Sequence, residues 1–385
     1  MANDFSIECK EALKLLARSR NVLVSGPPGT GKSKLLAEVA LVFGNGIAHA
    51  AASGVPVHNP ASRIPIPPVV GAVNSALAKQ YPAPGKTDRK VFRTVFHQNS
   101  KNRDFISGIT PAVNKVAGQP DFRIISGTLY RASQHAKGPQ GASLLIIDEI
   151  NRGPAVQVFG GSIVAIEPDK RLAPDGSKRD ETQYFEMLDP VTGEIAEYAL
   201  PYDLYILAAM NQADASVEPL DVAFLRRWEP MRLAPDVKVL RDFYGLPAAN
   251  ADPLPETPTT TAHAFEAAVR AWVAVNDQIS LGRGVEFRIG HGLLMSDTKP
   301  AAMSLDEALS FLCVGWAKVL AHVEEVFFGD IRGIAATLNA LDGPTFNPFK
   351  VTETTFADDL RFRLEGPNNF SAADIYPSLR AIARG

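Results

Sequence analysis

A glycine-rich stretch, GPPGTGKS at residues 26–33, has the spacing of a phosphate-binding loop. The pattern G-x-x-x-x-G-K-[ST] needs glycine because backbone N–H groups must curl around phosphate oxygens where a Cβ would clash. In this pattern the lysine, Lys32, reaches the terminal phosphates, and the hydroxyl of Ser33 is a ligand for Mg²⁺. We therefore assign the following residues to nucleotide binding: Gly26, Pro27, Pro28, Gly29, Thr30, Gly31, Lys32, Ser33 and Lys34.

Two adjacent acids, Asp148 and Glu149, end the apolar run SLLIIDE at residues 143–149. Acids commonly cap strands, so this pair by itself is weak evidence for chemistry. After a phosphate-binding loop, however, an acidic pair at a strand end is what nucleotide cleavage requires. We expect Asp148 to hold Mg²⁺ and Glu149 to polarise the attacking water.

A third polar position, Asn211, directly follows the apolar run DLYILAAMN at residues 203–211. A neutral amide at this place can orient the attacking water or contact the terminal phosphate. Asp214, three residues later, can hold the loop or help to position water. The alternative interpretation is an ordinary asparagine turn.

The segment LDVAFLRRW is predicted to be a helix that ends in Arg226 and Arg227. In a ring of subunits, one subunit's arginine can neutralise charge on the phosphate bound by its neighbour. Cations also stabilise a helix C-terminus without any partner, so the dipeptide alone fits both interpretations. The candidate catalytic residues are Lys32, Glu149, Asn211, Asp214, Arg226 and Arg227.

Short apolar runs are predicted to be the strands that carry these side chains. NVLVSG precedes the phosphate loop, and the runs at 143–149 and 203–211 end at the acids and at the asparagine. Their nearly continuous apolar character is typical of strands buried on both faces of a parallel sheet. KVFRTVFH (90–97) is a further strand candidate, and residues 5–19 and 32–44 are predicted helices, the second stopped by Gly44.

The sequence predicts an α/β core over residues 1–235, with a parallel sheet flanked by helices, followed by an all-helical part. Residues 45–88 form a Pro/Gly-rich insertion. The segment between the predicted strands at 143–149 and 203–211 is predicted to form polar, hairpin-like arms around Gly176 and Gly193. Residues 236–261 are interpreted as a Pro/Thr/Ala linker. Helical periodicity then dominates residues 262–385, a helical lid and C-terminal region.

Composition excludes several classes of protein. The 385 residues carry a net charge of −3, which argues against a general nucleic-acid-coating role. Cys9 and Cys313 are far apart and lack the spacing of a zinc site or a disulfide framework. No apolar run approaches the roughly 20 residues that span a bilayer, and charges within the first helix exclude a signal peptide. We expect a soluble, cytoplasmic protein with no membrane partner.

Together the motifs resemble those of the AAA+ ATPases, and more narrowly those of the McrB-type motor subunits of modification-dependent restriction systems. The resemblance extends over most of residues 20–330 and is carried by five stretches: TVFHQNSKNRDFISGITP, IIDEINRG, LYILAAMNQADASVEPLDVAFLRRW, FRIGHGLLM and HVEEVFFGD. Some positions depart from the family pattern. Ser100 and Asn102 replace two tyrosines, Ala215 replaces an arginine, and Trp228 replaces a phenylalanine.

The resemblance implies a ring, expected to be a hexamer, that hydrolyses ATP or GTP with Mg²⁺ and drives a separate nuclease or other effector in anti-phage defence. It also implies that Arg288 and His291 of FRIGH lie where the lid meets nucleotide, although a packed lid residue is an equal alternative. Only about 20 residues precede the strand before the phosphate loop, so no DNA-reading domain is expected ahead of the motor.

Contact with DNA is expected only through a partner or through basic arms that face the pore of the ring. The candidate arm residues are Lys170, Arg171, Lys178 and Arg179. A charge run of this kind is more often a solvated face. The alternative function is that of a MoxR-like ATPase, which remodels protein partners such as a von Willebrand A-type adaptor.

Overall fold

The computed structural model describes residues 5–49, 81–112, 122–213, 220–296, 300, 303–341, 343–367 and 369–383. Asp214 and residues 50–80 of the predicted insertion lie outside these ranges. The chain divides into two compact units. The first unit comprises Met1–Ser25 and Lys32–Arg232, and the second comprises Gly26–Gly31 and Leu233–Gly385. The phosphate loop thus groups with the C-terminal residues.

A five-stranded sheet forms the centre of the first unit, and every pair of neighbouring strands in it is parallel, as predicted. The strand order is β2-β5-β8-β1-β9. Because β1, β5 and β8 are neighbours and run in the same direction, their carboxyl ends meet at one edge of the sheet. The strands are β1 (Asn21–Ser25), β2 (Asp88–Val95), β5 (Gly141–Asp148), β8 (Leu204–Met210) and β9 (Glu229–Arg232).

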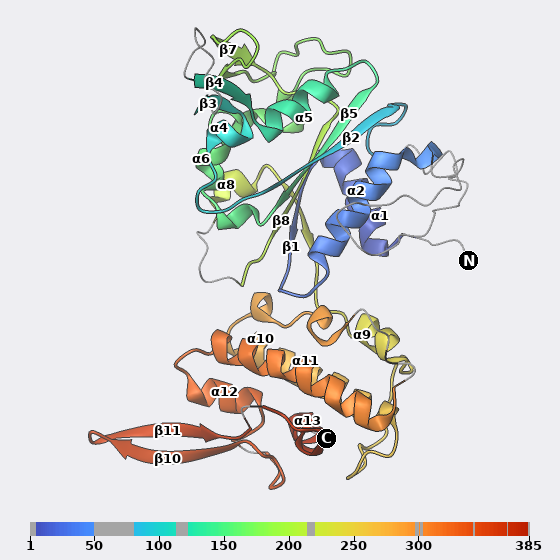
Figure 1. Cartoon of the computed structure of the whole chain (residues 1–385), viewed down its shortest axis with the longest axis vertical. Coiled ribbons are helices and arrows are strands. Elements are labelled where there is room, and N and C mark those ends of the chain that lie inside the picture. Colours follow the sequence, from blue (N-terminus) through green and yellow to red (C-terminus); the bar gives the residue numbers. More distant parts are fainter. Residues whose placement is uncertain are drawn as a thin grey trace. The chain divides into compact units, whose positions relative to one another are not determined.

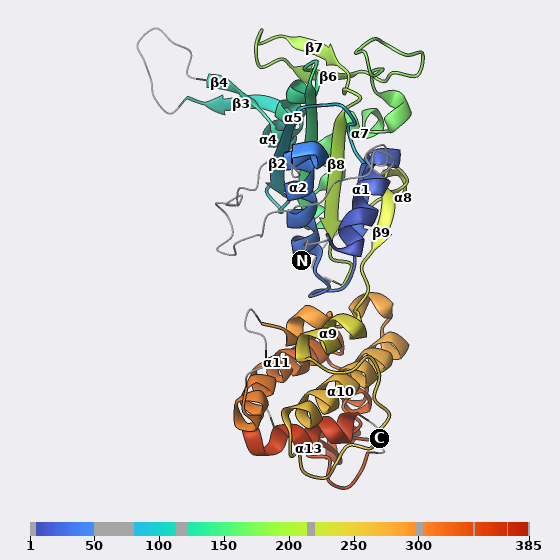
Figure 2. The same cartoon turned by 90° about the vertical axis from the view of Figure 1, so that its right-hand side faces the viewer.

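Helices cover both faces of this sheet, with α1 and α2 on one side and α5 to α8 on the other (Figures 1 and 2). Alternate strand residues such as Leu145 and Ile147 pack with α5 to α8 in one apolar cluster. α2 runs through Gly44 to His49, so the prediction that Gly44 ends this helix is wrong. The helices of the unit are α1 (Ile7–Ser19), α2 (Lys32–His49), α4 (Asn102–Phe105), α5 (Thr128–Ala136), α6 (Ala155–Phe159), α7 (Ser162–Ala165) and α8 (Val222–Leu225), with 3₁₀ turns η1 (Ile150–Arg152) and η2 (Pro168–Lys170).

Two antiparallel hairpins extend the first unit. β3 (Ser107–Pro111) pairs with β4 (Phe122–Ser126), and β6 (Phe185–Leu188) pairs with β7 (Ile195–Tyr198). The β6–β7 hairpin confirms the predicted arm around Gly193. Around Gly176 the chain forms a turn, in which the Gly176 N–H donates to the Ala173 carbonyl, and residues 171–184 contain no strand.

The second unit is mainly helical. α9 lies within residues 236–261, which the sequence suggested as a linker, and its Leu240 and Tyr244 are buried in the apolar core. An antiparallel hairpin that was not predicted also belongs to this unit. Its elements are α9 (Val237–Tyr244), α10 (Thr261–Gly282), α11 (Leu305–Val326), α12 (Ile331–Thr337), α13 (Ala372–Ile382), β10 (Lys350–Phe356) and β11 (Asp359–Glu365), with 3₁₀ turns η3 (Val285–Phe287) and η4 (His291–Leu294). No helix among the described residues is long and apolar enough to cross a membrane.

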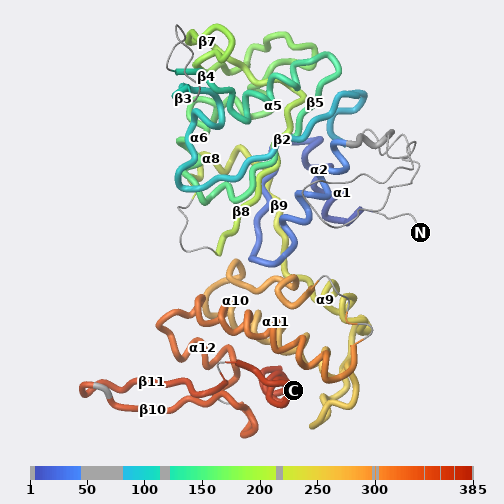
Figure 3. Tube along the Cα trace, viewed as in Figure 1, coloured from blue at the N-terminus to red at the C-terminus, as the bar shows by residue number. Residues whose placement is uncertain are grey.

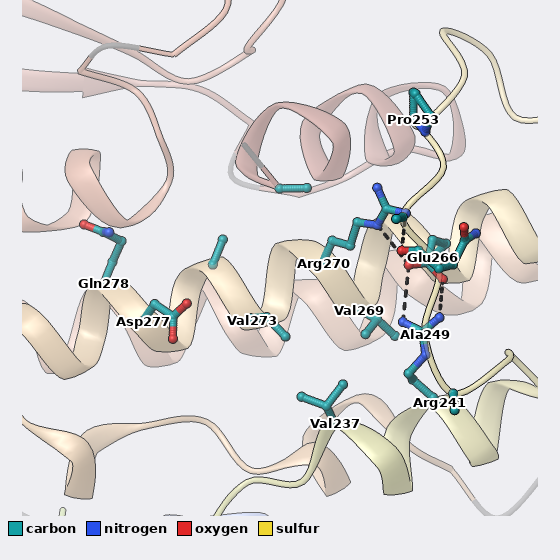
Figure 4. A pocket seen from close by; sticks show the side chains of 15 residues that line it. Val237, Arg241, Ala249, Pro253, Glu266, Val269, Arg270, Val273, Asp277 and Gln278 are labelled. Carbon is teal, nitrogen blue, oxygen red and sulfur yellow. Dashed lines mark hydrogen bonds and ion pairs between the residues drawn. The ribbon is translucent and has the colours of Figure 1, made fainter. Parts of the chain in front are cut away.

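A buried carboxylate braces this unit beside a pocket of about 780 Å³. Glu266 of α10 receives two hydrogen bonds from Arg241, at 3.2 and 2.8 Å, and one from Arg270 at 2.9 Å (Figure 4). Arg270 also donates to the carbonyls of Asn250 and Asp252, both at 2.8 Å. These charged side chains therefore neutralise one another, and they link the segment after α9 to α10.

Candidate nucleotide site

The phosphate loop connects the end of β1 at Ser25 to the start of α2 at Lys32 (Figure 3). Its glycines Gly29 and Gly31 have φ angles of +77° and +89°, in the left-handed region where a side chain is strained. The Thr30 hydroxyl donates a hydrogen bond of 2.9 Å to the Pro27 carbonyl and closes the curve. The residue types that the motif requires are thus needed by the backbone itself.

Backbone groups of the second unit hold two carbonyls of this loop. The Gly290 N–H donates to the Pro28 carbonyl at 2.9 Å, and the Gly292 N–H donates to the Gly29 carbonyl at 2.8 Å. In a trans peptide the N–H points opposite to the carbonyl of the same peptide unit. Fixing these two carbonyls therefore turns the N–H groups of Gly29 and Thr30 to the other side of the loop, where they can face phosphate oxygens.

The side chain of Lys32 shares its surroundings with the acidic pair. Burial lowers the pKa of Lys32, and the charges of Glu149 and then Asp148 oppose that shift. Asp148 ends β5, and its Oδ1 accepts a hydrogen bond of 3.0 Å from the Glu149 N–H. Glu149 has φ +52° and ψ +45°, and its Oε2 lies 3.2 Å from Nε of Arg152. One ammonium and two carboxylates thus interact where α2 begins and β5 ends.

Asn211 follows β8 directly and is joined to the acidic segment by a side chain that sequence reasoning missed. Asn151, two residues after Glu149, donates from Nδ2 to the Asn211 backbone carbonyl at 2.8 Å. The Oδ1 atoms of both asparagines are buried, and neither accepts a hydrogen bond from a described residue. The sequence signal that could have identified Asn151 is its position in the motif IIDEINRG, but the motif alone does not indicate what the side chain does.

The two arginines at the end of α8 have different surroundings. Nε of Arg227 lies 2.9 Å from Oε1 of Glu167, its side chain is only 6% exposed, and its Nη1 donates to the Ala223 carbonyl. The side chain of Arg226 is exposed and makes no hydrogen bond or ion pair with any residue in the described ranges, although the Arg226 backbone N–H donates to the Val222 carbonyl. Arg227 is therefore committed within its own chain, whereas Arg226 is available to another molecule.

The predicted lid residues lie in the second unit and make contacts within it. Nε of Arg288 donates to the Val285 carbonyl at 3.3 Å, and Nδ1 of His291 accepts from the Asp236 N–H at 3.2 Å. These contacts fit the packed alternative as well as a role at the nucleotide. Asp214 lies outside the described residues.

The predicted basic arm needs one correction. Arg171 is fully buried and donates to the carbonyls of Ile166 and Leu204 and to Oδ1 of Asn21. Burial, followed by repulsion from Arg20, lowers its pKa to about 9. The prediction that Arg171 faces a pore is therefore wrong, because two backbone carbonyls and the side-chain amide oxygen of Asn21 surround its buried guanidinium. Lys170 pairs with Asp169, Arg179 lies over the ring of Tyr202, and Lys178 is exposed.

A parallel sheet of order β2-β5-β8-β1-β9, a phosphate loop after β1, acids after β5 and a polar residue after β8 define a P-loop nucleoside triphosphatase of the AAA+ class. Residues 70–228 match the profile of the AAA domain of the dynein-related subfamily. The chain thus has the α/β fold of the AAA+ class. Within that class it is related to subunits of restriction enzymes, in agreement with the McrB-type resemblance.

Two curated relatives carry this relationship. The chain is 30% identical over 336 residues to the Type IV methyl-directed restriction enzyme EcoKMcrB subunit of Escherichia coli (strain K12), covering 83% of this chain and 56% of that protein. It is 29% identical over 223 residues to the Type II restriction enzyme BsuMI component YdiS of Bacillus subtilis (strain 168), covering 54% and 55%. The chain thus spans about half the length of each relative.

One solved structure is also similar, that of a proposed ATPase from Cytophaga hutchinsonii. The similarity covers 85% of this chain and 78% of that one, with 14% identity and a TM-score of 0.30.

Proposed function

We propose that this chain is the motor subunit of a restriction-type defence system, a ring of AAA+ subunits that hydrolyses GTP or ATP and drives a separate nuclease. The observation that carries the proposal is the meeting of Lys32, Asp148 and Glu149 at the sheet edge where Asn211 also lies. A chain that only bound a nucleotide would not need an acid suited to activate water. Similarity to two restriction-enzyme subunits supports the kind of system.

Each residue has a distinct role in the proposed site. The loop amides and Lys32 bind the phosphates, and burial of the ammonium strengthens its attraction for them because less water screens the charge. Glu149 accepts a proton from the attacking water, and the side-chain amide of Asn211 orients that water toward the terminal phosphate. Arg288 and His291 of the FRIGH segment also bind the nucleotide.

The oxygen ligands present suit Mg²⁺. Asp148 offers Oδ2 in addition to the Oδ1 that accepts from Glu149, and Ser33 is exposed at the start of α2. Among the described residues no three His, Cys, Asp or Glu side chains form a metal-binding group. That fits Mg²⁺, which takes one or two protein oxygens and fills its remaining positions with phosphate oxygens and water. Ser33 and Asp148 would hold the ion, which supplies neutralisation of phosphate charge.

The ring places Arg226 of one subunit at the nucleotide of its neighbour. Exposure of Arg226 and the internal ion pair of Arg227 favour Arg226 for this role. An arginine supplied in this way accelerates phosphoryl transfer by roughly 10³–10⁵ where it has been measured. A hexamer is the expected assembly.

A mixing experiment tests the site and the ring together. We expect Glu149→Gln and Arg226→Ala subunits each to be inactive alone, because every interface then lacks one part. Mixed rings contain interfaces with an intact Glu149 on one side and an intact Arg226 on the other, so turnover of NTP is expected to return. Native turnover by Glu149→Gln alone would refute the assignment of the base, and no recovery on mixing would refute the shared site.

Measuring GTP and ATP turnover, with and without DNA and the co-purifying partner, tests the remainder of the proposal. A nuclease partner is expected. A von Willebrand A-type adaptor in its place would refute the restriction role and support the protein-remodelling alternative.

A further inference from the structure

We infer that Asn151 is a positioning residue for hydrolysis, which holds Asn211 in register with the base Glu149. This inference rests on the proposed role of Asn211 and adds a residue to which neither the motifs nor the comparisons give a role. The contact that carries it is the hydrogen bond of 2.8 Å from Nδ2 of Asn151 to the backbone carbonyl of Asn211.

The bond lies where the sheet can no longer fix the two segments. β5 and β8 are paired as far as Ile147 and Ala208, and their ladder ends there. Glu149 and Asn211 both lie beyond that point, on segments whose relative position no ladder hydrogen bond sets. The Asn151 side chain joins these segments across 60 positions of the sequence.

The chemistry of the contact fixes the orientation of the amide. A carbonyl can only accept, so Asn151 must present Nδ2 to it and leave Oδ1 elsewhere. That Oδ1 is buried and accepts no hydrogen bond from a described residue. A purely structural buried asparagine is expected to satisfy both ends of its amide. The bond to Asn211 is therefore the contact that accounts for an amide at this position.

The bond involves the backbone of Asn211 and not its side chain. Its backbone carbonyl is held by Asn151, while its own Oδ1 accepts no hydrogen bond from the described residues. The backbone of Asn211 is thus held while the Oδ1 of its side chain is left unoccupied. Asn151 lies on η1, one residue beyond Ile150, so its position also follows that of Glu149. The attacking water must lie between the carboxylate of Glu149 and the side-chain amide of Asn211. A small displacement of either group is therefore expected to lower the rate of hydrolysis strongly.

The test compares kcat and nucleotide affinity in Asn151→Ala, the isosteric Asn151→Asp, Asn211→Ala and the double variant Asn151→Ala/Asn211→Ala. We expect each single variant to lose about tenfold or more in kcat, as positioned groups do, with nucleotide Kd nearly unchanged. Residues that act as a unit are not additive, so the double variant is expected to be no slower than Asn211→Ala.

Asn102→Ala is the matched control, because Asn102 in the same unit donates from Nδ2 to the Val158 carbonyl at 3.0 Å and is not part of the site. It is expected to keep native kcat. Native kcat in the Asn151 variants, or losses that multiply in the double variant, would overturn the inference. Native kcat in Asn211→Ala would instead refute the proposed role of Asn211, so the two failures are distinguishable.

Discussion

Substitution of Gly290 by alanine tests whether the backbone contacts of Gly290 and Gly292 orient the phosphate loop. A Cβ at this position would lie 2.1 Å from the Gly29 carbonyl carbon and 2.5 Å from the Pro28 carbonyl oxygen. Both are backbone atoms, so no side chain can move aside. The chain segment at Gly290 must therefore move away from the segment at Pro28 and Gly29. Separation breaks the Gly290 bond to Pro28 and strains the Gly292 bond to Gly29.

The expected loss follows from these two hydrogen bonds. Each contributes about 1 kcal/mol net, so up to about 2 kcal/mol of loop orientation is lost. If the nucleotide must restore that orientation on binding, its Kd rises by about fivefold for one bond and about thirtyfold for both. The effect should appear in affinity more than in kcat, because the loop binds phosphates in the ground state and in the transition state alike.

The assay is a calorimetric titration of Gly290→Ala with a slowly hydrolysed nucleotide analogue. Gly44→Ala is the matched control, because its added methyl meets only Val91 Cγ2 at 3.7 Å, an ordinary contact, within helix α2. The control is expected to bind like the native chain and to be no less stable, since alanine favours a helix interior. A folded Gly290→Ala protein with native Kd would refute the reasoning that these contacts orient the loop.

Two other predictions concern stability. Burial raises the pKa of Tyr205 from 10.0 to about 12. The stability that the neutral Tyr205 side chain adds to the folded state is therefore present below pH 10 and is lost as pH rises through about 12. Tyr205→Phe is expected to cost about 1 kcal/mol near neutral pH, because the Ala83 N–H loses its acceptor, and to weaken the alkaline decline in urea unfolding. Arg171→Ala leaves a cavity and removes a hydrogen-bond donor from the Leu204 carbonyl, so we expect a loss of about 3 kcal/mol or more in the same assay. An unchanged midpoint would show that Arg171 contributes no net stability.

Local patterns made much of the nucleotide site predictable. The phosphate loop was recognisable because glycine and lysine spacing is dictated by phosphate geometry within eight consecutive residues. The buried strands were recognisable by nearly continuous apolar runs, and a parallel sheet brings their carboxyl ends together. Lys32, Asp148 and Glu149 could therefore be placed in one site before their surroundings were known.

Roles set by distant contacts were not predictable in this way. Asn151 acts through a carbonyl 60 positions away, and Arg171 is satisfied by groups as far away as Asn21. A buried arginine with carbonyl partners has the same local sequence as a solvated one. The β10–β11 hairpin did carry a local signal, since apolar and polar residues alternate in LRFRLE, but the helical periodicity of its surroundings obscured it.

The arginine pair shows most clearly what packing adds to a motif. Arg226 and Arg227 have the same chemistry, and successive positions near a helix end point about 100° apart, so only one can face a given neighbour. Glu167 forms an ion pair with Arg227, whose side chain is only 6% exposed. Breaking this ion pair would leave the buried charge of Arg227 without a partner. Arg226 is left exposed at the adjacent position. The ion pair with Glu167 thus occupies Arg227 within its own chain and leaves Arg226 as the arginine that suits the proposed role at a neighbouring subunit.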